Sequence, residues 1–292
     1  MSTPELTLGT APRIARGTRI RRRFFRRPMA VTGLVLAVLF VLMAILAPLI
    51  APYSPGETDF AAPLAGPSSE HLLGADELGR DTFSRVVYGA RASMQVGVLA
   101  TALAMLVGVP LGLIAGYFRG WSDPVISRVT DVMLAFPFIV VAVGLAAIFG
   151  PSLTNATIAL MFAAMPGILR VTRGETLALR EEDYVRAAIA NGAGDPTILR
   201  RHILPNLTST LLVQATVTIP QLILGEALLS FLGLGVQPPT PSWGVMLSAA
   251  QPLLSQAPML AVFPGVAVAL ATLSFNLLGD GLRDVLDPRM TR

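Results

Sequence analysis

Long uncharged stretches alternate with short polar segments along this chain. No Asp, Glu, Lys or Arg occurs in residues 28–56, 92–118, 132–169, 203–225 and 227–279. A membrane-crossing helix needs only about 20 apolar residues, so the third run can cross twice, with a break at Gly150-Pro151-Ser152. The last run holds the end of one crossing, a proline-rich loop and another crossing. The pattern predicts an all-α integral membrane protein with six transmembrane helices, near residues 30–50, 94–117, 132–149, 154–170, 207–229 and 258–279.

A polar island at residues 181–205 separates two of the predicted crossings. Acidic residues at its start place negative charge where a helix dipole favours anions, and Gly192 is a natural terminator for this first helix. Asp195 can cap a second helix with Pro196 at its first position. The island therefore predicts a pair of short helices. They fit an ordinary solvated hairpin, or a docking element in which the small Ala187 and Ala188 let a partner approach the backbone closely.

Arginines indicate which side is cytoplasmic. Eight of them precede the first crossing against a single acid, Glu5, and the positive-inside rule places such an end in the cytoplasm. A nucleic-acid-binding arm lacks support, because aromatics are absent from this arm apart from Phe24 and Phe25. A signal-peptide n-region is disfavoured because the apolar run that follows is too long. The resulting topology places 19 arginines inside and only Arg80, Arg85 and Arg91 outside.

This topology divides the chain into segments with distinct environments. We expect a cytoplasmic arginine-rich arm, a first transmembrane helix, an external segment with an amphipathic helix, a transmembrane core and a cytoplasmic tail, at residues 1–29, 30–50, 51–93, 94–279 and 280–292 respectively. In the external segment, Asp81 can cap a helix that places Phe83, Val86, Val87 and Ala90 on one face. Such a helix is expected to lie flat on the outer surface, where it braces the bundle, shapes an outer gate or meets an external solute carrier.

The composition excludes several kinds of chemistry. All 22 basic residues are arginine, so a phosphate-binding loop of the GxxxxGK[ST] kind and a Schiff-base lysine are impossible. The chain has no cysteine, and its histidines, His71 and His202, fall on opposite sides of the predicted membrane. We therefore expect no enzyme, no metal site and no bound cofactor. Uphill transport would need a partner or an ion gradient to supply energy.

Two features lie inside the predicted crossings. Gly108, Gly112 and Gly116 form a small-xxx-small stripe that permits close helix packing, within the subunit or against a second one. Glu226 is the only acid in a predicted crossing, and burying a charge at mid-membrane costs at least about 2.5–3.5 kcal/mol. Glu226 is a candidate contact in a translocation pathway. A packing hydrogen bond and an interfacial position are the alternatives.

The polar island resembles the EAA loop of ABC importer permeases, in which Glu-Ala-Ala is followed at fixed spacing by Gly and then Ile-x-Leu-Pro. Ala187, Ala188, Gly192, Leu204 and Pro205 fall in register. The chain departs from the pattern at two positions, with Arg186 in place of Glu and His202 in place of Ile. In the family this loop is a helical knob that docks in the cytoplasmic ATPase. The resemblance implies that role here for Tyr184, Arg186, Ala187, Ala188, Gly192, Ala193, His202, Leu204 and Pro205.

Three further strings resemble the peptide/nickel class of these permeases. They lie at residues 73–81, 230–244 and 279–289, and with Arg27-Pro28 they extend the resemblance over nearly the whole chain from residue 24. Ala75 stands where the first string usually has Thr. That string is expected to form an external gate or a contact for a binding protein through Asp76, Gly79, Arg80 and Asp81.

The resemblance implies the C-type permease of a dipeptide or oligopeptide ABC importer with the type I fold, in a bacterial plasma (inner) membrane. The implied partners are a homologous B-type permease, one or two ABC ATPase subunits that use ATP and Mg²⁺, and an extracytoplasmic peptide-binding protein. The peptide substrate and the lipid bilayer complete this environment, and no nucleic acid is expected. A nickel or other small-solute permease is the alternative, although soft-metal ligands are scarce here. An ion-coupled carrier is remoter, because Glu226 is its only titratable candidate.

Overall fold

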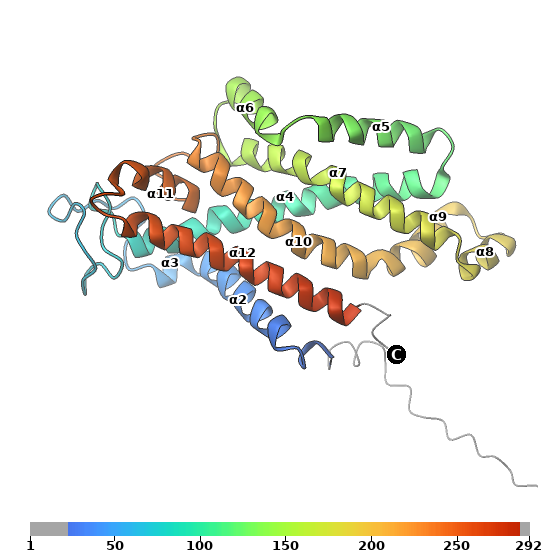
Figure 1. The fold of residues 1–292 in the computed structure, drawn as a ribbon, viewed down its shortest axis with the longest axis horizontal. Coiled ribbons are helices and arrows are strands. Elements are labelled where there is room, and N and C mark those ends of the chain that lie inside the picture. Colours follow the sequence, from blue (N-terminus) through green and yellow to red (C-terminus); the bar gives the residue numbers. More distant parts are fainter. Residues whose placement is uncertain (1–22, 287–292) are drawn as a thin grey trace, which may run out of the picture.

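The computed structural model describes residues 23–286, and helices make up all of its regular secondary structure apart from one isolated bridge between Ala75 and Asp81. Figure 1 shows an elongated bundle with α11 at one end and α8 at the other. In chain order the helices are α2 (Pro28–Ile45), α3 (Ala47–Ile50), α4 (Thr82–Phe118), α5 (Ser122–Ala135), α6 (Phe138–Phe149), α7 (Leu153–Arg180), α8 (Asp183–Ala190), α9 (Asp195–Thr197), the π-helix η1 (Ile198–Ile203), α10 (Leu204–Phe231), α11 (Trp243–Ala250), the 3₁₀-helix η2 (Gln251–Leu253) and α12 (Met259–Leu286).

The apolar pattern predicts most of the long helices correctly. Within residues 23–286, five helical stretches are long and apolar enough to cross a membrane, and the count reaches six if the bent pair α5–α6 forms one span. The predicted crossing at 132–149 is not a single straight helix, because α5 and α6 meet at 80°. Pro137 explains the break: a residue before proline is pushed out of helical geometry, and Phe136 has an extended backbone with φ −91° and ψ 122°.

The external amphipathic helix predicted to lie flat is not a separate element. Asp81 does cap a helix, accepting a hydrogen bond from the Ser84 backbone N–H at 2.7 Å, but that helix continues to Phe118 as α4. The interval between the predicted surface helix and the second crossing contains only Arg91 as a charge and no residue that ends a helix. The outer part of α4 is therefore an extension of a membrane span.

The glycine stripe of α4 packs against α7, inside the subunit. A Cβ on Gly112 would lie 2.6 Å from Thr172 Cβ and 2.7 Å from the Leu169 carbonyl oxygen. A Cβ on Gly116 would lie 2.7 Å from Thr176 Cβ. Because only glycine fits at these distances, the stripe brings the backbones of α4 and α7 together, as small residues do in membrane helix pairs.

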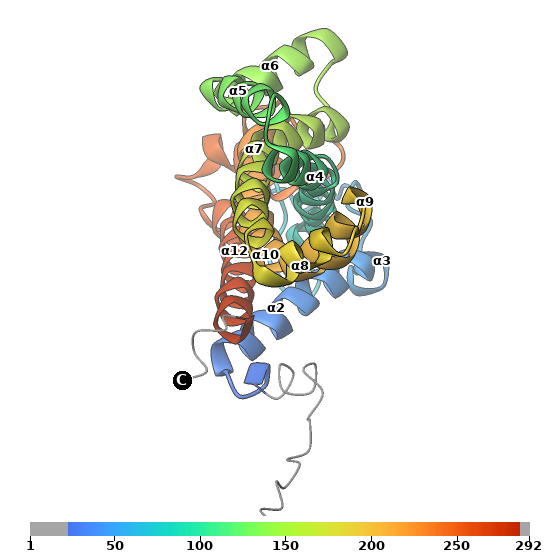
Figure 2. The same cartoon turned by 90° about the vertical axis from the view of Figure 1, so that its right-hand side faces the viewer.

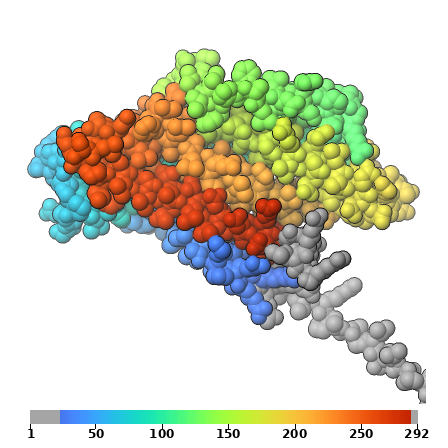
Figure 3. Space-filling model, in the orientation of Figure 1, coloured from blue at the N-terminus to red at the C-terminus, as the bar shows by residue number. Residues whose placement is uncertain are grey.

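The remaining spans complete a bundle in which α12 packs against both α2 and α10. Figures 1 and 2 place α5 and α6 on one flank and α2 on the opposite flank. Figure 3 shows α12, α10 and α7 lying side by side across one face, with α5 above them. At the α11 end, Trp243 is fully buried, donates from Nε1 to the Val86 carbonyl at 3.0 Å and meets the Phe40 ring edge-on at 5.9 Å.

Candidate coupling loop and external cap

The first short helix of the polar island forms as predicted. α8 covers Asp183–Ala190, and Gly192 ends it with φ +78°, a left-handed conformation that favours glycine. The Gly192 N–H donates to the Ile189 carbonyl at 2.9 Å, and the Ala193 N–H donates to the Ala188 carbonyl at 3.1 Å. These bonds form a Schellman motif, which satisfies carbonyls at a helix end. Gly192 and Ala193 therefore have a defined role in shaping the loop.

The second short helix differs from the prediction. Asp195 is the first residue of α9 and does not cap it, because the N-cap position belongs to Gly194. The Asp195 carboxylate instead accepts a hydrogen bond from the Tyr117 hydroxyl at 2.7 Å, which links the loop to the end of α4. The helix then runs through η1 into α10, so the helical stretch that carries the fifth predicted crossing extends from Asp195 to Phe231.

Apolar contacts hold the loop against the ends of the spans. Val185, Ile198 and Ile203 are buried in one cluster with Tyr117 of α4 and Leu207 of α10. Burying each such side chain contributes about 1.5–3 kcal/mol relative to leaving it exposed. The loop is thus packed directly against α4 and α10.

Arg186, one of the two departures from the family pattern, joins a small charge network. Its guanidinium donates to one oxygen of Glu181 at 2.7 Å, and Arg119 donates to the other oxygen at 2.7 Å. These hydrogen bonds hold the pKa of the Glu181 carboxyl below its usual range, and Glu181 raises the pKa of the Arg186 guanidinium. The two ion pairs are exposed, so they orient α8 more than they stabilise it.

The structure brings the other predicted loop residues to the same end of the molecule. The Tyr184 hydroxyl donates to the His202 carbonyl at 3.4 Å, their rings lie 6.4 Å apart, and partial burial raises the pKa of the Tyr184 phenol. The predicted loop residues are either exposed or half-buried. Tyr184, Arg186, Ala187, Gly192 and Pro205 are exposed, whereas Ala188, Ala193, His202 and Leu204 are half-buried. The loop therefore presents a backbone-rich, accessible surface at the α8 end.

The predicted external site is mainly a structural cap. The Asp76 carboxylate accepts hydrogen bonds from the Leu78 and Arg80 backbone N–H groups and from Arg80 Nε at 2.7 Å. It also pairs with Arg85 Nε at 3.4 Å, and Arg85 donates to the Pro55 carbonyl at 2.9 Å. The side chains of Arg80 and Arg85 are only 9% and 3% exposed. Asp76 and Arg80 thus support the fold of the cap with little exposed surface, and their role in a gate or a binding-protein contact stays a prediction.

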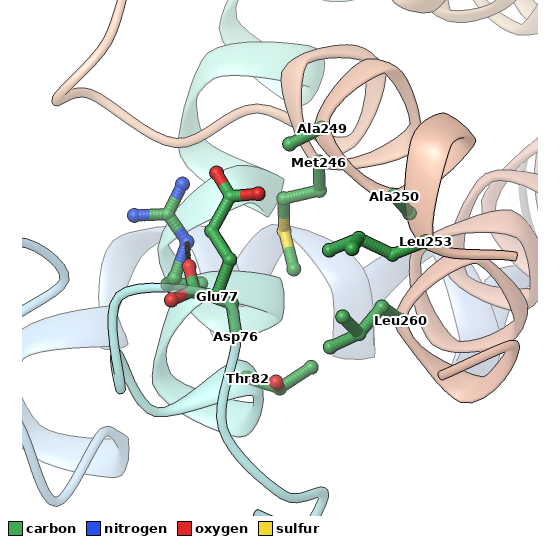
Figure 4. A pocket seen from close by; sticks show the side chains of 9 residues that line it. Asp76, Glu77, Thr82, Met246, Ala249, Ala250, Leu253 and Leu260 are labelled. Atoms are coloured by element: carbon green, nitrogen blue, oxygen red, sulfur yellow. Dashed lines mark ion pairs between the residues drawn. The ribbon is translucent and has the colours of Figure 1, made fainter. Parts of the chain in front are cut away.

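Gly79 and Asp81 serve the same cap. Asp81 is buried, and its Oδ1 lies 3.0 Å from Nδ1 of His71, whose ring packs on Tyr53. Gly79 has φ +72°, and its Cα lies so close to the backbone of Asp59 that no side chain fits there. Figure 4 shows the cap facing α11 and the start of α12 across a small pocket, with Asp76 and Glu77 on one side and Met246 and Leu260 on the other.

Glu226 lies in the interior of the bundle. The side chain has no exposed surface, and its oxygens accept hydrogen bonds from the Ser93 hydroxyl at 2.6 Å and the Ser230 hydroxyl at 2.7 Å. Ser230 also accepts from the Val236 backbone N–H at 3.1 Å. Glu226 therefore ties α10 to α4 and to the loop before α11, and it offers a substrate no accessible atom in this conformation.

Two ion pairs between α5 and α7 are not predicted from the sequence. Arg173 pairs with Asp123, and Arg170 pairs with Asp131. Arg170 ends the predicted crossing 154–170, and the other three residues lie outside the predicted crossings 132–149 and 154–170. Charges at such positions are typical of ordinary loops. One sequence signal could have predicted these pairs: aspartates precede one apolar run, and arginines follow the next apolar run along the chain.

These features define a helical subunit of a membrane transporter, with a short loop helix exposed at one end of its spans. Residues 108–292 match the family described as "Binding-protein-dependent transport system inner membrane component". Residues 16–67 match "N-terminal TM domain of oligopeptide transport permease C". The first match covers more than half of the chain, and the chain belongs to this family of ABC importer permeases.

Similar proteins agree with this assignment. The chain is 47% identical over 265 residues, 91% of its length and 87% of the relative's, to the dipeptide transport system permease protein DppC of Alkalihalophilus pseudofirmus. It is 44% identical to the glutathione transport system permease protein GsiD of Pectobacterium atrosepticum, over 92% of this chain and 90% of that one. A chain in an inward-facing structure of the MetNI methionine ABC transporter matches with a TM-score of 0.57 and 21% identity, covering 70% of this chain and 97% of the other. The last likeness shows the fold alone.

Proposed function

We propose that this chain forms one half of the membrane pathway of an ATP-driven importer for short peptides. The observation that carries the proposal is the 47% identity to a dipeptide permease over nine-tenths of the chain. Glutathione, itself a short peptide, is a second candidate substrate, because relatives at 44–46% identity are glutathione permeases. Neither relative is named for nickel, so the metal alternative has no support from these comparisons.

The partners follow from family membership and from the α8 loop, which comprises residues 181–205. A homologous second permease completes the pathway, ATPase subunits supply the energy, and an extracytoplasmic binding protein delivers the peptide. The α8 loop is the docking element for the ATPase. Its exposed Ala187 and the open space around Gly192 permit close approach, while its buried Val185 and Ile198 connect it to the spans. ATP and Mg²⁺ bind to the ATPase, and this chain needs no cofactor of its own.

The proposed mechanism is mechanical. Closure of the ATPase subunits around ATP displaces the α8 loop, and this displacement reaches α4 through Tyr117 and α10 through Leu207. The pathway opens outward, receives the peptide and returns to the inward-facing state after hydrolysis. This chain contributes binding surface and coupling, and its partner performs the hydrolysis.

The orientation in the membrane is also part of the proposal. The α8 loop lies in the cytoplasm of a bacterial cell, and the Asp76 cap and α11 lie outside the inner membrane. In Figure 1, α2 begins and α12 ends toward the α8 end of the bundle, so both chain termini are assigned to the cytoplasm. The arginines divide into 19 toward the cytoplasm, counting Arg170 at the inner end of its crossing, and three outside, which supports this orientation.

Uptake assays test the proposed function. The complete importer, which combines this chain with the second permease, the ATPase subunits and the binding protein, is reconstituted in vesicles, and uptake of labelled dialanine and labelled glutathione is measured with and without ATP. We expect ATP-dependent uptake of at least one of the two peptides. Uptake of neither peptide, with ATP hydrolysis intact, would overturn the assignment to short peptides.

A further inference from the structure

The two ion pairs between α5 and α7 differ in kind. Arg173 binds Asp123 with two hydrogen bonds, from Nε to Oδ1 and from Nη2 to Oδ2, the second at 2.8 Å. Arg170 binds Asp131 with a single hydrogen bond of 3.3 Å, and these side chains are 61% and 57% exposed. Two-pronged pairs are the more rigid and specific, whereas exposed single contacts contribute little to stability. The first pair therefore holds the helices together, and the second is free to exchange partners.

The exchangeable pair lies at the inner end of the membrane core. Counted from Leu153 at the outer end of the span, Arg170 follows by 17 positions, a helix length of about 26 Å, which is just short of the inner boundary of a hydrocarbon core about 30 Å thick. Exposed apolar side chains such as Val129 and Val132 cover the rest of the same part of α5. Charged groups facing lipid are costly, and such groups usually face a water-filled cavity. The surface with Asp131 and Arg170 is therefore assigned to the aqueous pathway.

A cleft adjoins this pair. It is open to solvent and is lined by Ser127, Thr130, Asp131, Leu169, Arg170 and Arg173. Only one of these side chains, Leu169, is apolar. The cleft offers guanidinium donors and a carboxylate acceptor within a few ångströms of each other, so it complements a ligand that carries both a negative and a positive group.

We propose that Asp131 and Arg170 form a charge clamp for the free termini of a short peptide in the translocation pathway, an inference that rests on the proposed peptide-import function. The Arg170 guanidinium donates to the peptide carboxylate, and the Asp131 carboxylate accepts from the peptide ammonium group. An extended dipeptide spans about 7 Å, so the two side chains must part to admit it. The Arg173–Asp123 pair keeps α5 on α7 meanwhile.

Terminally blocked peptides test the clamp in the reconstituted importer. Uptake of dialanine, its C-terminal amide and its N-acetyl form is measured at saturating binding protein for Arg170→Gln and Asp131→Asn. Each rate is divided by the wild-type rate for the same peptide, which cancels selectivity imposed by other subunits. We expect Arg170→Gln to lower uptake of dialanine about 10-fold, the loss of one charge-assisted hydrogen bond, and to spare the amide. Asp131→Asn should spare the N-acetyl peptide. Arg128→Gln is the control. It removes a charge from α5, the helix of Asp131, at a position that does not line the cleft, and it should leave all uptake rates near wild type.

A second variant distinguishes a peptide-binding role of Asp131 and Arg170 from a purely structural role, either within this chain or at the contact with the second permease. The double variant Asp131→Asn with Arg170→Gln keeps two groups able to hydrogen bond to each other but removes both charges. The clamp predicts loss of dialanine uptake with ATP hydrolysis preserved. Normal dialanine uptake in the double variant, or an equal loss for free and blocked peptides in the single variants, would overturn the clamp and leave the import function standing. A wild-type importer that takes up no peptide would instead overturn the proposed function itself.

Discussion

Single residues decide how closely these helices approach. Gly112 faces Thr172 and Leu169, and no side chain fits between them. The environment of Glu226 also depends on residues distant in the sequence, because one of its hydrogen-bond donors, Ser93, lies 133 positions earlier in the chain. The sequence shows that Glu226 is unusual, but it does not show which of its three interpretations holds. That choice depends on which helices face one another.

The glycine contact predicts a sharp difference between two alanine substitutions. Gly112→Ala places a methyl group 2.6 Å from Thr172 Cβ and should destabilise the protein by about 1–3 kcal/mol through overpacking. Gly167→Ala lies on α7 with no atom within 4 Å of its Cβ, and it should be neutral or stabilising because alanine favours helix. Thermal unfolding of the purified chain in detergent measures both. Equal midpoints for the two variants would contradict close packing of α4 on α7.

At the scale of elements, sequence periodicity predicts the spans but not their junctions. Pro137 lies inside one uncharged run, and hydropathy alone does not show that it turns α5 from α6 by 80°. The external helix predicted as a surface element merges with the second span, because no breaker separates them. The string at residues 73–81 resembles a family pattern, and two of its polar residues, Arg80 and Asp81, are buried supports for a loop.

The external cap should depend on Asp76. Asp76→Ala leaves Arg80 and Arg85 buried without their carboxylate partner, and losing one member of a buried pair typically costs about 3–5 kcal/mol. The cap should then become sensitive to protease added from outside, as detected by cleavage within residues 51–81. Glu77→Ala changes the adjacent exposed carboxylate and serves as the control. Matching cleavage rates for both variants would show that Asp76 does not organise the cap.

At the scale of the whole molecule, charge and hydropathy suffice to predict the order of spans and loops. The bundle places the α8 loop and the Asp76 cap at opposite ends of its long axis, as the arginine distribution requires (Figure 1). The proposed pathway surface cannot be predicted from such patterns. Asp131 and Arg170 lie 39 positions apart, and their meeting depends on the packing of α5 against α7.

Cysteine labelling tests the orientation, since the chain has no cysteine of its own. Ser68, Gln251 and Thr197 are all exposed, so each tolerates a single cysteine. In intact cells, an impermeant thiol reagent should label Ser68→Cys and Gln251→Cys but not Thr197→Cys. Permeabilised cells provide the control, where all three should react. Labelling of Thr197→Cys in intact cells is incompatible with a cytoplasmic α8 loop.

The coupling role of the α8 loop is tested most directly by substitutions at Gly192 in the reconstituted importer. Its φ of +78° is strained for valine and tolerated by asparagine, while the space around it admits both side chains. Gly192→Val should unfold the Schellman motif, reduce copurification of the ATPase and uncouple ATP hydrolysis from peptide uptake, with membrane insertion unchanged. Gly192→Asn should retain most coupled uptake. Full ATPase binding and full ATP-driven uptake in Gly192→Val would contradict the claim that this loop connects the permease to its motor.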